Sequence, residues 1–385
     1  MENKTIDIDK YIPYGRQWVD EDDIRAVCEV LRSDYLTTGP KIAEFEQTTA
    51  EYAGSRYAAA VSNGTAALHT ACMAAGISPG DEVITTPVTF AASANCILYC
   101  GGKPVFADID ARTYNIDPAD IRRKVTPKTK AIIAVHLAGQ PCDMDEIHKI
   151  AAEHNLVVIE DAAHALGALY KGKKIGGLSD LTTFSFHPVK PVTTGEGGMV
   201  MTDDEELYKR LCLLRSHGIE KGASGLENQD GMWYYEQQML GYNYRLSDIQ
   251  CALGLSQMQK LDSFIKMRKR LAQRYDEAFA DCEDLIIPYQ LEGTQSGWHL
   301  YIIQVLHHDR RSIFQRLREK GIGVNVHYIP VYRHPYYRKH GYADVYCENA
   351  EKLYRNMLSL PIYPLLTLKE QDRVIDCVKE VICSS

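Results

Sequence analysis

A lysine and a glycine-rich turn follow a short apolar run near the middle of the 385-residue chain. Residues 181–186 resemble a buried strand, and Lys190 stands between this run and the Glu-Gly-Gly turn at residues 196–198. A lysine amine in this position could form an imine with an aldehyde cofactor. Because most lysines are solvated, this interpretation depends on two other stretches that could complete a site.

An acid and an imidazole stand at the end of an earlier apolar run. Asp161 closes residues 156–161, Leu-Val-Val-Ile-Glu-Asp, and His164 comes three residues later. Ligand crevices of open α/β sheets lie at the carboxyl ends of the strands. A carboxylate there can keep a pyridine nitrogen protonated, so that the ring accepts electrons from a neighbouring carbanion. Asp161 could instead cap the next helix, and His164 could be a hydrogen-bonded structural histidine.

A third stretch could hold a phosphate group. Residues 62–67, Ser-Asn-Gly-Thr-Ala-Ala, follow a short strand and begin a helix, where Gly64 and Thr65 would offer N–H groups and a hydroxyl. Ser185, five residues before Lys190, could reach the same phosphate. A helix cap and a buried strand hydroxyl are the simpler alternatives. An amine, an acid and a phosphate site in this order together predict a site for pyridoxal 5′-phosphate (PLP).

Composition narrows the class of protein. Hydrophobic residues make up 45% and charged residues 24% of the chain, as in ordinary globular proteins. The net charge of −8 argues against nucleic acid as a partner. No apolar run is long enough for a transmembrane helix and residues 1–4 lack a signal-peptide core, so we expect a cytoplasmic protein without membrane contact. Eleven scattered cysteines without a Cys-x-x-Cys motif predict buried free thiols and no metal site.

Short apolar runs alternate with helical patterns over the first 215 residues. Such alternation predicts an α/β fold, with a mostly parallel sheet covered by helices. We expect strands at residues 58–61, 82–85, 104–106, 131–135, 156–159, 182–186 and 199–201. Helical spacing of apolar residues predicts helices at residues 20–33, 42–54, 66–75, 91–99, 145–154 and 205–215.

The pattern changes beyond residue 247. Residues 249–279 resemble one long charged helix, and a strand at 300–305 and helices at 310–320 and 368–382 follow. These elements predict a smaller α+β domain. We therefore expect a large domain over residues 19–255 and a small domain over residues 256–385, with residues 1–18 crossing over to pack on the small domain.

The order of these motifs resembles the DegT/StrS family of nucleotide-sugar aminotransferases. The matching stretches, in chain order, are Asn63-Gly64-Thr65, Thr89-Phe90, Asp161-Ala-Ala-His164, Ser185-Phe186 with Lys190, and residues 196–198, 214–218 and 241–245. The resemblance runs from about Ile12 to the C-terminal helical pattern. It implies a fold-type I PLP-dependent transferase fold, and a homodimer whose active sites lie at the interface between subunits.

The resemblance also implies a role for individual residues. Lys190, Asp161 and His164 would be catalytic: Lys190 would bind PLP covalently, Asp161 would contact the pyridine nitrogen, and His164 would contact the phenolic oxygen. The other cofactor contacts would be stacking by Phe90 and phosphate binding by Gly64, Thr65, Ser185 and, from the other subunit, Asn243. The nucleotide sugar would meet Gly64, Ser185 and Asn243, together with Tyr14, Asp34, Tyr35, Leu36, Thr37, Arg245, Asn325, Val326, His327 and Tyr328.

Four stretches resemble one branch of that family, which makes UDP-4-amino-4,6-dideoxy-N-acetyl-β-L-altrosamine on the way to pseudaminic acid. They are residues 185–194, 214–218, 243–246 and 325–330, whereas residues 62–65 are closer to the general family pattern. This branch implies ping-pong transamination. L-Glutamate would leave as 2-oxoglutarate, and its amino group would pass to the C4 ketone of a UDP-linked 4-keto-6-deoxy-N-acetyl-hexosamine.

Three alternatives remain open from the sequence. A GDP- or dTDP-linked keto-sugar could replace the UDP-linked one in the same reaction. A PLP-dependent sugar dehydratase of the same fold would carry His in place of the lysine, so Lys190 argues against it. A non-catalytic PLP-binding regulator would be favoured by an appended DNA-binding domain, and the sequence shows none.

Overall fold

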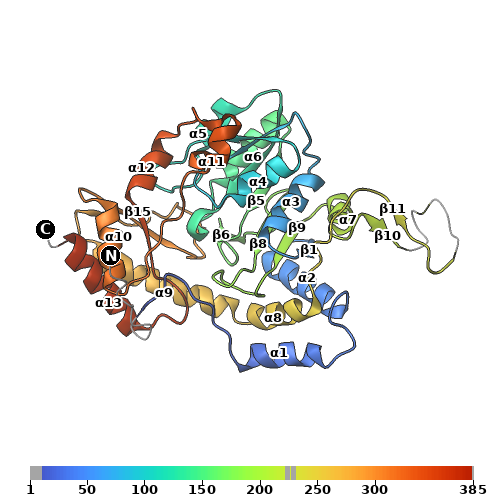
Figure 1. Ribbon diagram of the computed structural model, residues 1–385, viewed down its shortest axis with the longest axis horizontal. Helices are drawn as coiled ribbons and strands as arrows, with labels where there is room; N and C mark the ends of the chain where they lie inside the picture. The colour runs from blue at the N-terminus through green and yellow to red at the C-terminus, as the bar shows by residue number, and fades with distance from the viewer. Residues whose placement is uncertain (1–10, 222–225, 227–230, 384–385) are drawn as a thin grey trace.

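A seven-stranded sheet forms the centre of the computed structural model, which describes residues 11–221, 226 and 231–383 (Figure 1). The strand order is β1-β9-β8-β5-β4-β2-β3. Strand β9 runs antiparallel to both of its neighbours, β1 and β8, and all other strand pairs of this sheet are parallel. The predicted, mostly parallel sheet is therefore confirmed. The strands are β1 (Tyr57–Val61), β2 (Glu82–Thr85), β3 (Lys103–Phe106), β4 (Thr129–Val135), β5 (Val157–Asp161), β8 (Leu181–Ser185) and β9 (Gly198–Thr202).

Helices cover both faces of this sheet. Consecutive residues of a strand point to opposite faces, and in β4 Ile132 joins one hydrophobic core while Ile133 joins another. The first core includes residues of α2, α6 and α8, and the second includes residues of α3, α4 and α7. The helices of this part are α1 (Glu21–Leu31), α2 (Pro40–Ala53), α3 (Gly64–Ala74), α4 (Ala92–Tyr99), α5 (Pro118–Lys124), α6 (Met144–His154), α7 (Glu205–Leu214) and α8 (Asp248–Met258).

A separate hydrophobic core in the C-terminal part of the chain forms around a small antiparallel sheet of order β12-β14-β15. Ile12 belongs to this core and forms a β-bridge with Ile322. The boundary near residue 255 and the assignment of residues 1–18 remain predictions. The elements here are β12 (Leu285–Ile286), β14 (Tyr301–Val305), β15 (Met357–Leu360), α9 (Leu261–Phe279), α10 (Arg310–Glu319), α11 (Pro335–Tyr337), α12 (Glu348–Asn356) and α13 (Leu368–Val378). A three-stranded sheet, β13-β6-β7, joins Thr294–Gln295 to Leu169–Tyr170 and Lys173–Lys174.

The single long helix predicted over residues 249–279 is wrong, because α8 ends at Met258 and α9 begins at Leu261. The residues between them, Gln259 and Lys260, are good helix formers, so local propensity does not explain the break. The Nζ atom of Lys260 lies 2.7 Å from both Asp20 Oδ1 and Asp23 Oδ2 at the start of α1. These tertiary contacts hold the residues of the break against α1.

The expectation of free thiols is wrong for two of the eleven cysteines. Cys282, just beyond α9, forms a disulfide with Cys383 after α13, across a sequence separation of 101 residues. The other nine cysteines are free. Distant cysteines carry no local pairing signal, so only the packing of α13 beside the end of α9 brings these two together.

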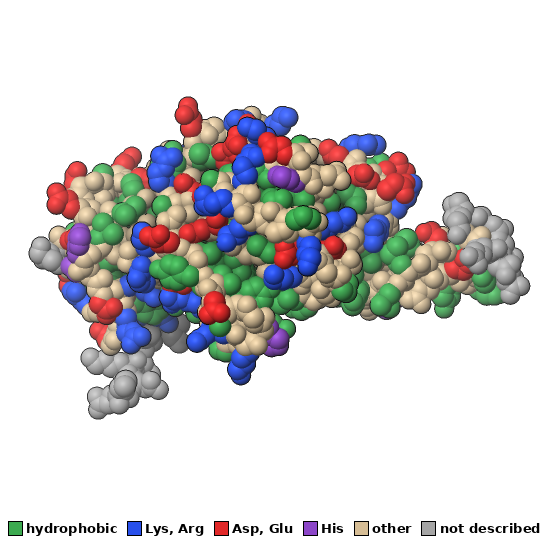
Figure 2. All heavy atoms as spheres, turned by 90° about the horizontal axis from the view of Figure 1, so that it is seen from above, with side chains coloured by type: hydrophobic (Ala, Val, Ile, Leu, Met, Phe, Trp, Pro, Cys, Tyr) green, Lys and Arg blue, Asp and Glu red, His purple; other side chains and the backbone are tan. Residues whose placement is uncertain are grey.

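A two-stranded hairpin projects from the body of the protein (Figures 1 and 2). Its strands, β10 (Ile219–Glu220) and β11 (Glu236–Gln237), pair antiparallel beyond the end of α7. Figure 2 shows hydrophobic side chains along this arm. The exposed large hydrophobic residues of the arm are Met232, Trp233, Tyr235 and Leu240.

Two classes of feature are missing from the part of the chain that the structure describes. Its helices are all too short or too polar to cross a membrane. Within the same ranges, no three His, Cys, Asp or Glu side chains are grouped so that they could hold a metal ion.

Arg268 of α9 ties three segments of the C-terminal part together. It is 1% exposed, and its Nη1 atom donates to the carbonyl oxygens of Trp298, His299 and Ile362 at 3.2, 3.3 and 2.9 Å. Burial lowers the pKa of this guanidinium to about 10. The side chain therefore fixes the loop before β14 to the loop after β15.

Replacing Arg268 with Met should destabilise this part of the protein, because the three carbonyl oxygens lose their donor. We expect a loss of about 2–4 kcal/mol, measured as a lower melting temperature in calorimetry. Arg270→Met is the matched control, since Arg270 is exposed on the same helix and should melt as wild type does. Equal melting temperatures for the two variants would contradict this role of Arg268.

Candidate active site

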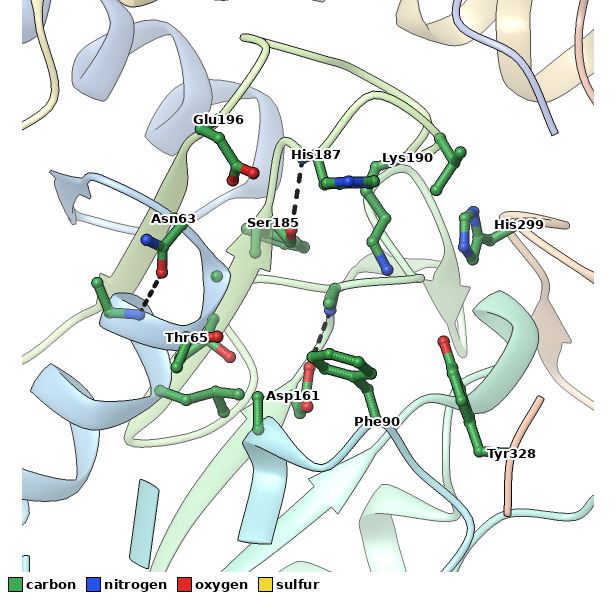
Figure 3. Close-up of a pocket in the computed structure, with 18 of the residues that line it drawn as sticks. Asn63, Thr65, Phe90, Asp161, Ser185, His187, Lys190, Glu196, His299 and Tyr328 are labelled. Atoms are coloured by element: carbon green, nitrogen blue, oxygen red, sulfur yellow. Dashed lines mark hydrogen bonds between the residues drawn. The ribbon is translucent and has the colours of Figure 1, made fainter. Parts of the chain in front are cut away.

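A cavity of about 840 Å³ opens at the carboxyl ends of β5 and β8. These two strands are parallel neighbours, and Asp161 pairs in register with Thr183. The turn that carries Lys190 follows β8 directly, so the sheet brings Lys190 to the same edge as Asp161. Figure 3 shows the Lys190 side chain pointing into the space bounded by Phe90, Tyr328 and His299, with Asp161 at its floor.

The amine of Lys190 is poised to lose its proton near neutral pH. The turn is closed by a hydrogen bond from the backbone N–H of Lys190 to the carbonyl of His187, at 2.9 Å. Burial lowers the pKa of the Lys190 amine to about 8, while the negative charge of Asp161 acts in the opposite direction. A larger fraction of this lysine is therefore neutral, and nucleophilic, at physiological pH than of an ordinary surface lysine.

Asp161 is 6% exposed and is held by two neutral donors. Its Oδ2 atom accepts a hydrogen bond from Ser93 Oγ at 2.6 Å, and its Oδ1 atom accepts one from the N–H of Ala163 at 3.2 Å. Neither donor carries a charge, so the carboxylate keeps its own charge available to a bound ligand. Hydrogen bonds of this kind favour the ionised form of a carboxyl group.

The start of α3 forms an anion cradle opposite Lys190. Asn63 caps the helix by accepting a hydrogen bond from the N–H of Ala66 at 2.8 Å. The first N–H groups of a helix have no intrahelical acceptor, and the helix dipole favours an anion there. A Cβ atom on Gly64 would lie 2.8 Å from the Cβ of Ser185, so only glycine allows this close approach. Gly64, Thr65 and Ser185 all line the cavity.

Three neutral histidines lie on the far side of Lys190. Burial lowers the pKa of His164 and of His299 well below the ordinary value, and it lowers the pKa of His327 to about 4. The charge of Lys190 acts in the same direction on all three. The rings of His164 and His299 have centroids 4.3 Å apart, and the Tyr328 hydroxyl lies 3.2 Å from His164 Nε2. These side chains can hydrogen-bond a polar ligand without adding charge.

Most of the predicted site residues meet in this one cavity. Those that line it are Tyr14, Gly64, Thr65, Phe90, Asp161, Ser185, Lys190, Asn325, Val326, His327 and Tyr328. His164 lies just behind Tyr328, to which it is hydrogen-bonded. Phe90 is 62% exposed, so its ring is accessible for stacking on a planar ligand.

The remaining predicted residues gather elsewhere on the same chain. Thr37 forms a β-bridge with Ser247, and Asn243 forms one with Ser216 at the base of the β10–β11 arm. Arg245 donates to the hydroxyl of Ser216 at 3.3 Å. Besides His164, six of the predicted site residues do not line the cavity. They are Asp34, Tyr35, Leu36, Thr37, Asn243 and Arg245.

Sequence reasoning missed other residues that line the cavity. Among them are Tyr99, Glu196, Tyr244 and His299, of which Glu196 and Tyr244 were noted only as parts of the motifs at residues 196–198 and 241–245. His299 comes just before a predicted strand, so its position beside a strand end was the one available signal. Tyr99 and Tyr244 both contact His69 of α3, a tertiary contact for which the sequence holds no local signal.

These residues fit PLP by their chemistry. A lysine amine with a lowered pKa, a buried acid held by neutral donors, and a helix N-terminus too tight for any residue but glycine match its aldehyde, ring nitrogen and phosphate. Phe90 and Ala163 both line the cavity and can face the two sides of a planar ring.

Comparison with known proteins agrees with this chemistry. A model of the DegT/DnrJ/EryC1/StrS aminotransferase family matches residues 17–379. The spore coat polysaccharide biosynthesis protein SpsC of Bacillus subtilis is 44% identical over 378 residues, 97% of each chain. The UDP-4-amino-4,6-dideoxy-N-acetyl-β-L-altrosamine transaminase of Campylobacter jejuni is 38% identical over 377 residues, 96% of this chain and 97% of the relative.

Solved structures show the same fold. Helicobacter pylori PseC, an aminotransferase of pseudaminic acid biosynthesis, is 34% identical with a TM-score of 0.91, covering 98% of this chain and 100% of PseC. A related sugar aminotransferase has been solved in forms with PLP and with its amine counterpart. The fold is therefore that of the fold-type I PLP-dependent enzymes. The chain belongs to the DegT/DnrJ/EryC1/StrS aminotransferase family and is a PLP-dependent sugar aminotransferase.

Proposed function

We propose that the enzyme transfers the amino group of L-glutamate to C4 of a UDP-linked 4-keto-6-deoxy-N-acetyl-hexosamine. The product would be UDP-4-amino-4,6-dideoxy-N-acetyl-β-L-altrosamine, a precursor of pseudaminic acid. One observation carries the amino transfer: the amine of Lys190 and the acid of Asp161 face a single cavity with an anion cradle on its opposite wall. The choice of sugar is supported by the 38% identity to the Campylobacter transaminase.

Each part of the cofactor has a partner among these side chains. When bound, PLP supplies an aldehyde that takes up the donor's amino group and a ring that accepts electrons. Asp161 would hold the proton on the ring nitrogen, and His164 would hydrogen-bond the phenolic oxygen. The N–H groups at the start of α3, with Thr65 and Ser185, hold the phosphate. Phe90 covers one face of the ring and excludes water from it.

Lys190 moves the proton in both halves of the reaction. When glutamate has taken the place of Lys190 on the cofactor, the Nζ atom of Lys190 would be free. It would take a proton from the α-carbon of glutamate and deliver a proton to the imine carbon of the cofactor. A pKa near 8 suits both steps, because the same amine must accept the proton and then release it. The first half releases 2-oxoglutarate. In the second half Lys190 would make the same proton transfers in the reverse order, ending with a proton delivered to C4 of the sugar.

A different nucleotide keto-sugar is the second candidate substrate. The identity to SpsC, 44%, exceeds the 38% identity to the Campylobacter transaminase, and the name of SpsC refers to a spore coat polysaccharide. The site chemistry is the same for a GDP- or dTDP-linked sugar, because Lys190 moves protons at the reacting carbons and Asp161 serves the cofactor ring, and neither role involves the nucleotide.

A second subunit supplies what this cavity lacks in our proposal. A UDP-sugar carries a diphosphate and glutamate carries two carboxylates, yet Lys190 is the only Lys or Arg among the described residues that line the cavity. Arg245 and Asn243 lie outside it and beside the exposed β10–β11 arm. We therefore propose a homodimer in which these residues, with Asp34–Thr37, face the partner's substrate.

We also propose that the enzyme works in the cytoplasm, where nucleotide sugars are made and where its nine free cysteines would stay reduced. The Cys282–Cys383 disulfide is the exception to this expectation, since disulfides are uncommon in cytosolic proteins.

Lys190→Ala should abolish turnover and the absorbance band of lysine-bound PLP, because no other lysine lines the cavity in the described part of the chain. In wild-type protein, glutamate should shift that band and 2-oxoglutarate should restore it, which a non-catalytic PLP-binding protein would not show. Rates and spectra of the two proteins are the measurement. Normal turnover by the alanine variant would refute the role of Lys190.

Wild-type enzyme should aminate the UDP-linked 4-keto sugar at least about tenfold faster, in kcat/KM, than GDP- or dTDP-linked analogues, an advantage of about 1.4 kcal/mol in transition-state binding. Mass spectrometry of the products, with NMR to fix the configuration at C4, makes the comparison. Faster turnover of the GDP- or dTDP-linked sugar would contradict the UDP-sugar as substrate and support the second candidate.

A shared site predicts that two inactive variants complement each other. Lys190→Ala and Asn243→Ala homodimers should each be impaired. A mixed dimer would contain one site with both residues intact, so the mixture should regain about a quarter of wild-type activity. If Asn243 serves the site of its own chain, mixing restores nothing. Mixing each variant with itself is the control.

A further inference from the structure

Two buried hydroxyls stand behind the carboxylate that faces the cofactor. Ser93, in the first turn of α4, is fully buried, and its Oγ atom lies 2.6 Å from Asp161 Oδ2. Thr89, just before α4, is 3% exposed, and its Oγ1 atom lies 2.7 Å from Ser93 Oγ. The three side chains thus form one continuous chain of hydrogen bonds that leads from the interior to the cavity.

The direction of these hydrogen bonds follows from donor counting. An ionised carboxylate can only accept, so the single hydroxyl proton of Ser93 must point at Asp161. The carbonyl of Phe90 is a poorer acceptor for that proton, at 3.3 Å. The Oγ atom of Ser93 is then free to accept, and Thr89 donates to it. The order Thr89 to Ser93 to Asp161 is cooperative, because each donated bond strengthens the next.

The other groups around Asp161 do not replace this support. The N–H of Ala163 holds Oδ1 at the longer distance of 3.2 Å. The ionisable side chains that sense the charge of Asp161 are the amine of Lys190 and the phenol of Tyr328. Lys190 must be neutral to attach to PLP, so it cannot serve as a permanent counter-ion. Ser93 is therefore the closest constant donor to this carboxylate.

We propose that Ser93, supported by Thr89, is a positioning residue that holds the Asp161 carboxylate aimed at the ring nitrogen of PLP. A neutral donor fixes one oxygen without consuming the negative charge, whereas an arginine in its place would compete with the ring for that charge. The proposal deepens the proposed function, because it rests on Asp161 being the partner of the ring nitrogen.

Ser93→Ala tests this role with readouts other than turnover. We expect the dissociation constant for PLP, measured by reconstituting cofactor-free protein, to rise about tenfold, as the loss of one hydrogen bond to a charged group predicts. In nitrogen-15 NMR of bound PLP labelled at the ring nitrogen, the ring should lose its proton at lower pH than in wild type. The value of kcat should fall while KM for glutamate changes little.

A second position keeps the test independent of any folding defect in Ser93→Ala. Thr89→Val removes the upstream donor at nearly constant volume and should shift the ring titration in the same direction by a smaller amount. Thr89→Ser keeps the hydroxyl and should restore the wild-type titration. Ser256→Ala, a buried serine in α8 away from the cavity, is the matched control and should behave as wild type does.

Two results would overturn the proposal. The first is a folded Ser93→Ala protein with wild-type PLP affinity and ring titration. The second is a Thr89→Val protein that matches Thr89→Ser in both measurements. Either result would leave the proposed aminotransferase intact, because wild-type protein would still bind PLP through Lys190. Failure of wild-type protein to bind PLP would instead refute the proposed function itself.

Discussion

A buried carboxylate and a buried amine face one cavity, and the rest of the structure depends on holding them there. Asp161 must stay charged although it is 6% exposed, and Lys190 must be able to become neutral. Burial acts on both groups, and it lowers the pKa of the lysine to about 8. The acid is held in place by hydrogen bonds from Ser93 and the N–H of Ala163. Burial therefore lowers the pKa of the amine, and two uncharged donors hold the acid.

The sheet and the C-terminal part each contribute one wall of this cavity. Parallel pairing of β5 and β8 sets Asp161 and the Lys190 turn at one edge, and α3 begins close enough to Ser185 that only glycine fits at residue 64. His299 and Tyr328 come from the C-terminal part of the chain. Arg268 donates to the carbonyl of His299 and so ties this wall to α9.

Charge balance explains why one chain is not a complete enzyme in our proposal. Its cavity offers a single cation, which the cofactor consumes, while the substrates bring several negative charges. The exposed arm, and the Asn243–Arg245 segment at its base, lie outside the chain's own site. A second copy that brings this edge to the cavity would supply charge and cover the hydrophobic arm at the same time.

The sequence by itself determined most of the strand and helix pattern of the first 215 residues and the cofactor class, and it predicted Lys190, Asp161 and Gly64 as site residues from local patterns at a strand end or helix start. Only the tertiary structure decided what depends on distant partners. Ser93 bonds Asp161 across 68 residues, His299 meets His164, Cys282 pairs with Cys383, and contacts to α1 lie at the break between α8 and α9. Hydroxyls, imidazoles and thiols look alike along a chain, and packing alone selects which of them touch.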